Sequence, residues 1–135
     1  MPISYDVHGG GHFISAVASA PLTIEEFVEY EVAHAMDGRI SPPVSELFTI
    51  QQGAFSQITM DDMLKLLERR KTGERSPTPH RCAIVVALGD AHAWELAKFY
   101  EGMAKLHYPE SVIVFGDEHT AKIYLGVGAA GPAKA

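Results

Sequence analysis

The chain has 135 residues, 47% of them hydrophobic and 21% charged, which is the balance of a globular protein and excludes global disorder. The 17 acidic residues outnumber the 11 basic ones, and a net charge of −6 argues against nucleic acid or an anionic membrane surface as a general target. No stretch reaches the ~20 apolar residues that a bilayer needs, MPISYDV lacks a signal-like start, and Cys82 is the only cysteine. We therefore expect a cytoplasmic protein with no membrane span.

The first two predicted elements are strands, Ile3–Val7 and Phe13–Ala20, separated by the phrase HGGGH. Three glycines suit a hairpin loop, because a tight loop needs residues with positive φ. An esterase oxyanion loop is excluded, since the chain has no G-x-S-x-G. His8 and His12 can face each other at ~5 Å across such a hairpin, but two imidazoles are fewer than a metal site uses. We predict a turn and no metal site, with a His8/His12 site as the alternative.

A helix is predicted to begin at the capping box Thr23-Ile-Glu-Glu26 and to end near Gly38. Its apolar stripe is Ile24, Phe27, Val28 and Ala35. The prolines of residues 40–44 mark a loop, and Glu46–Gln51 is the next strand.

The next helix begins at about Thr59, with Asp62 three residues later and an apolar stripe that includes Met60, Met63, Leu64 and Leu67. The polar connector 71–80 ends it. One basic group, formed by Arg69, Arg70, Lys71 and Arg75, lies at this helix end, where cations are favourable against the helix dipole.

The segment Cys82–Leu88 is apolar without alternation, which predicts a parallel strand covered on both faces and placed in the middle of the sheet. A helix over 90–106 follows, capped by Asp90, then a strand over 111–115 and a short helix carrying Ala121, Tyr124 and Leu125. We expect one domain over residues 1–125 and a flexible tail over 126–135.

The predicted order is β-β-α-β-α-β-α-β-α. It defines an α/β fold in which an N-terminal β-hairpin is followed by alternating strands and helices, with helices packed against a mixed, mostly parallel sheet. Ligand sites in such sheets gather beyond the carboxyl ends of the strands, here residues 51–56, 89–92 and 116–117.

Three phrases carry a family resemblance: SAVASAPLTIEEFVEY, HRCAIVVALGDAHAWELAKFYEGM and SVIVFGDEHTAKIYL. In this order, and spread over Ile3 to Leu125, they resemble the STAS fold. More narrowly, they resemble small bacterial proteins that are similar to the sporulation anti-anti-sigma factor and are described as STAS and lipid-transfer-like. The resemblance implies a regulatory module that binds a partner protein or a small ligand.

The chain departs from that family's pattern after the third strand. Phosphorylatable STAS regulators carry an Asp-Ser-Ser type phrase there, whereas this chain has QQGAFSQIT. Ser56 and Thr59 are the candidate phosphorylation sites, and Thr59 is also a natural N-cap.

No nucleophile, base and orienting group come together in the sequence, so we predict a non-catalytic protein without a cofactor. Asp90 and His92 can form an acid–base pair at a helix start, but an N-cap aspartate beside a solvated histidine explains them equally simply. Cys82 lies within a predicted buried strand, where a thiol is inaccessible. The predicted ligand or partner site comprises Gln52, Ser56, Thr59, Asp90 and His92.

The alternative function is transport or sensing of a small apolar, lipid-like ligand. The pocket would lie between helices and sheet and be lined by Trp94, Phe99, Tyr100, Met103, Met60 and Met63, although such stripes are usually ordinary core. A homodimer is also expected, because the edge strand Ile3–Val7 is short and lightly charged and can pair with a second copy or be covered by the tail.

Overall fold

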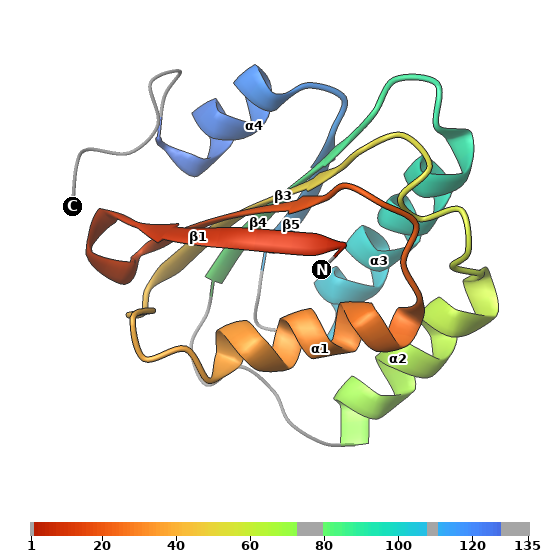
Figure 1. Cartoon of the computed structure of the whole chain (residues 1–135), viewed down its shortest axis with the longest axis horizontal. Coiled ribbons are helices and arrows are strands. Elements are labelled where there is room, and N and C mark those ends of the chain that lie inside the picture. Colours follow the sequence, from red (N-terminus) through yellow and green to blue (C-terminus); the bar gives the residue numbers. More distant parts are fainter. Residues whose placement is uncertain (1, 73–79, 108–110, 128–135) are drawn as a thin grey trace.

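The computed structural model describes residues 2–72, 80–107 and 111–127, and these form an α/β fold (Figure 1). The elements in chain order are β1 (Ile3–His8), β2 (Phe13–Ala18), α1 (Ile24–Ala35), β3 (Val44–Ile50), α2 (Met60–Thr72), β4 (His80–Val86), α3 (Ala91–His107), β5 (Ser111–Phe115) and α4 (Glu118–Leu125). A short 3-10 turn over Gly9–Gly11 joins β1 to β2. The predicted hairpin and the predicted alternation of strands and helices are confirmed.

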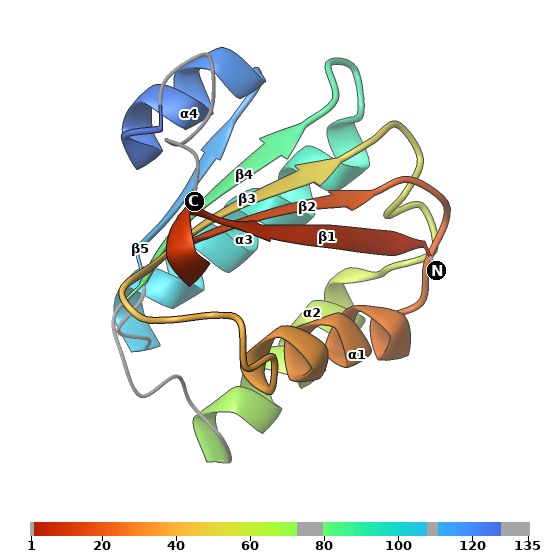
Figure 2. The ribbon, with the colours of Figure 1, turned by 60° about the vertical axis from the view of Figure 1, so that its left-hand side comes forward.

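The five strands form one mixed sheet in the order β1-β2-β3-β4-β5. The β1–β2 pair is antiparallel, and the other three pairs are parallel. Parallel crossovers are right-handed, and here each one advances in the same direction across the sheet. The helices α1, α2 and α3 therefore lie on one face, whereas α4 turns back over the other face (Figure 2).

The two faces of the sheet support two apolar clusters. The side of α1, α2 and α3 holds the larger core, which includes Ala16, Phe48, Ile50, Ile84, Val86 and Val112. The side of α4 holds the smaller core, formed by Phe13, Leu47, Ala83, Val85, Ala121 and Leu125. Consecutive residues along β3, and likewise along β4, thus belong to opposite clusters, because successive side chains of a strand point to opposite faces of the sheet.

The strand predicted to be central is not the middle one. Residues 82–86 of β4 are buried on both faces, as expected, but β3 occupies the middle position. Complete burial requires only that helices cover both faces, and α3 and α4 both pack on β4. The strand also ends at Val86, and the exposed Leu88 lies in the turn that follows.

Helix α1 begins at the predicted capping box. The Glu26 backbone N–H donates to Thr23 Oγ1 at 3.2 Å, and the Thr23 backbone N–H donates to Glu26 Oε1 at 2.9 Å. Three residues of the predicted apolar stripe, Ile24, Phe27 and Val28, pack against the larger core. The fourth, Ala35, is exposed, and Tyr30, which the stripe left out, is the buried residue.

The end of the described chain is packed. Gly126 adopts a left-handed conformation (φ +79°) that caps α4, and Val127 packs against the smaller core. The packed part therefore extends two residues past the predicted start of the tail. Residues 128–135, residues 73–79 and the side chains of the basic group at the end of α2 lie outside the described part of the structure.

Candidate functional site

The HGGGH turn is a structural connection between the hairpin and the loop before β3. Gly11 has φ +96°, and a Cβ at this position would stand 2.2 Å from the Arg39 carbonyl oxygen, so only glycine fits. The Ser41 backbone N–H donates to the Gly11 carbonyl at 2.8 Å. His12 Nδ1 lies 2.7 Å from the Ser41 carbonyl and 3.0 Å from that of Pro43, so its N–H is directed at these two acceptors.

The two histidines of this turn do not face each other as the metal alternative supposed. His8 pairs with Phe13 across the hairpin, and their rings lie 5.7 Å apart between centroids. His12 turns toward the loop before β3 instead, because the turn occupies four residues between the paired positions. Among the described residues, no three His, Cys, Asp or Glu side chains are grouped to hold a metal ion.

Two of the predicted site residues tie together the segments beyond β3 and β4. Asp90 Oδ2 accepts from the Gly53 backbone N–H at 3.0 Å, and its Oδ1 accepts from the Ala93 backbone N–H at 3.2 Å. His92 Nε2 lies 2.6 Å from the Ile58 carbonyl oxygen, which a ring N–H can reach as a donor. Asp90 is thus the predicted cap of α3, and both side chains also fix the loop before α2.

The other three predicted site residues, Gln52, Ser56 and Thr59, are exposed on that loop. Thr59 forms a second capping box: the Asp62 backbone N–H donates to Thr59 Oγ1 at 3.0 Å, and the Thr59 backbone N–H donates to Asp62 Oδ2 at 2.9 Å. The predicted role of Thr59 as an N-cap is confirmed. Ser56 is held only through its backbone N–H, which donates to the Gly53 carbonyl at 3.1 Å.

We call residues 51–59 and 87–94 the strand-end rim, because they lie beyond the carboxyl ends of β3 and β4. Two large apolar side chains on it are exposed: Leu88 at 85% and Trp94 at 41%. Leu88 stands on the turn between β4 and α3, while Trp94 lies in the first turn of α3 with the Lys98 ammonium 6.0 Å from its ring centroid. Sequence periodicity missed Leu88, because it ends an apolar run that otherwise belongs to the core.

The residues proposed to line an apolar pocket occupy different positions. Met63 and Tyr100 are buried in the larger core, and Met60, Phe99 and Met103 pack against it. Trp94 is on the rim and outside that core. The stripe thus acts mainly as packing between the helices and the sheet.

A buried polar pair inside the larger core was not predicted. The Tyr30 hydroxyl donates to Glu46 Oε2, and both residues are nearly inaccessible, at 4% and 6% exposure. Cys82 is the β4 residue directly opposite Glu46, and the His34 ring lies 4.9 Å from that of Tyr30. Burial, and then the neighbouring Glu46 carboxylate, raise the pKa of Tyr30 well above its ordinary value. The sequence signal that could have revealed the burial of Glu46 is the two-residue period of the strand, which places Glu46 on the same face as Phe48 and Ile50.

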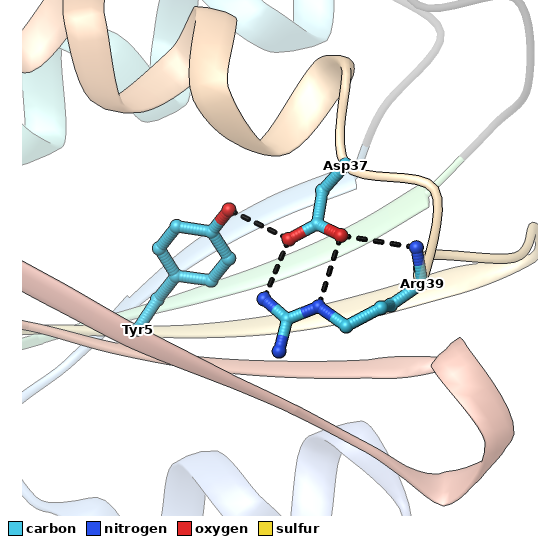
Figure 3. Close-up of polar contacts among 3 residues, drawn as sticks. All are labelled: Tyr5, Asp37 and Arg39. Carbon is cyan, nitrogen blue, oxygen red and sulfur yellow. Dashed lines mark hydrogen bonds and ion pairs between the residues drawn. The ribbon is translucent and has the colours of Figure 1, made fainter.

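A second polar group, shown in Figure 3, joins β1 to the end of α1. The Tyr5 hydroxyl donates to Asp37 Oδ2 at 2.8 Å, while Arg39 donates from Nε to Oδ1 at 3.0 Å and from Nη2 to Oδ2 at 2.6 Å. The hydrogen bonds from Arg39, followed by that from Tyr5, hold the pKa of Asp37 below its ordinary value. Partial burial, followed by the bond to Asp37, raises the pKa of Tyr5. Each oxygen of Asp37 already accepts two hydrogen bonds, so this group fixes the fold and offers little to a ligand.

Comparison of the chain with protein-family models, with curated proteins and with solved structures found no match. In the described part of the chain, no helix has the length and apolar character to cross a membrane.

Proposed function

We propose that the chain is a non-catalytic binding and regulatory module of STAS type, and that it acts through a partner protein docked on the strand-end rim. The element order supports the first part, because a hairpin followed by alternating strands and helices is what the family resemblance implies. The position of the rim supports the second, since binding sites of open α/β sheets lie beyond the carboxyl ends of the strands.

The observation that carries the proposal is the combination of a fixed backbone with exposed apolar side chains. Asp90 and His92 use their hydrogen-bonding atoms to hold the loop before α2 against α3, so the rim is rigid before a partner arrives. Leu88 and Trp94 remain exposed on it. A few buried anchor residues supply most of the free energy in protein interfaces, and tryptophan is enriched among them.

The charge of the chain indicates what surrounds the apolar contact. The net charge is −6, and the exposed carboxylates beside the rim include Glu95 on α3 and Asp117, which follows Gly116 next to Leu88. We therefore expect a partner surface with an apolar centre and a basic margin, because complementary charge speeds encounter and selects among partners. Phosphorylation of Ser56, which is exposed on the rim, would add about two negative charges there and would alter that selection.

The test compares two exposed leucines. Leu88 is 85% exposed on the rim, and Leu106 is 74% exposed near the end of α3, so Leu88→Ser and Leu106→Ser are matched in chemistry and exposure. Proteins of the native cell that the immobilised wild-type chain retains are quantified beside those that each variant retains. We expect a partner that both the wild type and Leu106→Ser bind and that Leu88→Ser binds at least about ten-fold less, since burying a leucine is worth roughly 1.5–3 kcal/mol, or about ten- to 150-fold in affinity. Identical retention by all three baits would contradict the proposal.

The apolar-ligand alternative predicts a different result from the same preparation. Native mass spectrometry of freshly purified protein would then show an added mass above 14.7 kDa that organic extraction removes. The binding module predicts the unmodified mass together with the loss of partner in Leu88→Ser.

A further inference from the structure

We infer that the outer edge of β1 is a self-association surface, where two copies of the chain pair their β1 strands antiparallel about a two-fold axis at Tyr5. The inference is independent of the rim, which lies beyond the carboxyl ends of β3 and β4. The two edges of the sheet differ in how their backbone groups are bonded.

The edge at β5 is partly protected by α3. Helix α3 packs along β5, and the Val114 backbone N–H donates at 2.9 Å to Oε2 of the buried Glu101 on that helix. The other Glu101 oxygen lies 2.6 Å from Lys98 Nζ, which balances its charge. Natural sheets protect edges in this way because unpaired backbone groups invite another strand.

The edge at β1 lacks such a cover among the described residues (Figures 1 and 2). The Ser19 backbone N–H donates to the Pro2 carbonyl at 2.9 Å, one step beyond the Ile3–Ala18 pair of the ladder. Hydrogen-bonded pairs alternate with unbonded pairs in an antiparallel ladder, so the even-numbered residues of β1 bond to β2. The N–H and C=O groups of Ile3, Tyr5 and Val7 then point away from the sheet, and no described residue bonds to them.

These outward groups restrict how two copies can pair. Antiparallel pairing through them joins odd-numbered residues, so the axis passes through one of residues 3 to 7. An axis at Tyr5 pairs Tyr5 with itself and Ile3 with Val7, which allows about six hydrogen bonds and the longest overlap. An axis at Asp6 would place two exposed carboxylates opposite each other, which is unfavourable. With the axis at Tyr5, each Asp6 instead faces Ser4 of the other copy.

The side chains of β1 are also held in place without a partner. Ile3 is buried and the Tyr5 hydroxyl is fixed by Asp37, so the central residues keep their positions without a partner. Ser4 and Asp6 are exposed on the opposite face. Because both copies carry a charge of −6, added salt should favour association by screening their repulsion.

The test uses charge at Ser4, which is exposed and whose replacement leaves the core intact. In the Tyr5 register, Ser4→Lys places a cation opposite Asp6 twice in the dimer, and Ser4→Asp places two carboxylates together twice. Sedimentation equilibrium should show a concentration-dependent dimer of the 14.7 kDa chain. Ser4→Lys should tighten the dimer, and Ser4→Asp should weaken it, each by about two- to thirty-fold. Weakening by both substitutions would place the axis at Ser4 and overturn the Tyr5 register.

Val7→Pro provides a second, backbone test. It removes an outward N–H without breaking a bond to β2, so it should abolish the dimer while thermal unfolding remains cooperative. A single 14.7 kDa species at every concentration and salt would overturn the inference. A dimer unaffected by Val7→Pro and by both Ser4 variants would do so too, because another surface would then be responsible. A monomer that dimerises only after removal of residues 128–135 would show that the tail occupies the edge, which also overturns it.

Discussion

Replacing Tyr30 with phenylalanine tests the buried polar pair with a minimal change. The substitution removes one hydroxyl and keeps the ring, which contacts the aromatic rings of Phe48 and Phe27 at centroid distances of 5.3 and 6.2 Å. The packing of the larger core should therefore be retained. What is lost is the donor that Tyr30 supplies to the buried Glu46 carboxylate.

The size of the effect follows from burial. A hydrogen bond to a charged group contributes roughly 1.5–3 kcal/mol, and a buried acceptor that loses its donor keeps its desolvation cost. Tyr30 and Glu46 are each less than a tenth exposed, so water cannot readily replace the hydroxyl. We expect Tyr30→Phe to lower the free energy of unfolding by about 2 kcal/mol, or the melting temperature by roughly 8 °C for a chain of this size.

The pKa of Tyr30 adds a pH signature to this variant. Its pKa in the folded state is raised above the ordinary value of 10.0, so the unfolded chain releases this proton at a lower pH than the folded chain. The contribution of the protonated Tyr30 hydroxyl to the free energy of unfolding is therefore fully present below pH 10, and it is lost as the pH rises from there through the pKa of the folded state. A single group gives a slope of about 1.4 kcal/mol per pH unit, which Tyr30→Phe should remove.

The assay is urea unfolding followed by far-UV circular dichroism, between about pH 7 and pH 11. Tyr5→Phe serves as the matched control, because Asp37 keeps its bonds to Arg39 when that hydroxyl is lost, and its effect should be smaller. If Tyr30→Phe unfolds within about 0.5 kcal/mol of the wild type and retains the alkaline slope, the buried pair does not stabilise the fold as argued.

Three further predictions concern the turn, the rim and the acid range. In thermal unfolding, Gly11→Ala should lower the free energy of unfolding by at least about 2 kcal/mol more than Gly10→Ala does. The reason is that a Cβ at Gly11 would lie 2.2 Å from the Arg39 carbonyl oxygen, whereas a Cβ at Gly10 would lie 4.0 Å from His12. Equal losses in the two variants would contradict the close approach. Asp90→Ala should lower the free energy of unfolding by about 2 kcal/mol and speed amide exchange at Gly53, since it removes both the cap of α3 and the hydrogen bond to the Gly53 backbone. Unchanged exchange at Gly53 would contradict the role of Asp90 in holding this loop. The pKa of Asp37 is lowered from 3.8 in the folded state, so the Asp37 carboxylate contributes fully to the free energy of unfolding above that pH, and the contribution is lost as the pH falls below it. Asp37→Asn should therefore flatten the dependence of stability on pH below about pH 4. A variant with the same pH dependence as the wild type would contradict this.

Much of the fold was predictable because its signals are local. Both capping boxes join residues three apart, and Asp90 caps α3 from a position adjacent to it. The hairpin required only the glycines between two alternating segments. Such features depend on a few neighbouring residues, so a sequence pattern suffices to predict them.

The polar contacts that close the structure were not predictable in the same way. Tyr30 and Glu46 are 16 residues apart, and Tyr5 and Asp37 are 32 apart. Their meeting depends on strand order and on how far each helix is rotated. In α1 the sequence period correctly predicted Ile24, Phe27 and Val28 on the core side, but it included the exposed Ala35 and left out the buried Tyr30. All five predicted site residues lie on the loop before α2 or at the start of α3, because the carboxyl ends of parallel strands meet at one edge. The sequence pattern could not show that Asp90 would bond to the Gly53 backbone instead of remaining available to a ligand.

The hairpin is held to the rest of the molecule by polar contacts from the middle of β1 and from the turn between β1 and β2. Tyr5 on β1 bonds to Asp37, and at the turn Gly11 and His12 bond to the loop before β3. An isolated two-stranded hairpin is only marginally stable, so these polar ties add to the burial of Ile3, Phe13 and Ile14 in fixing its register. The same ties fix the outward backbone of β1 that we assign to self-association. A change at Asp37 should therefore weaken the dimer without touching its surface, whereas Ser4→Asp should weaken it and leave the unfolding of the monomer unchanged.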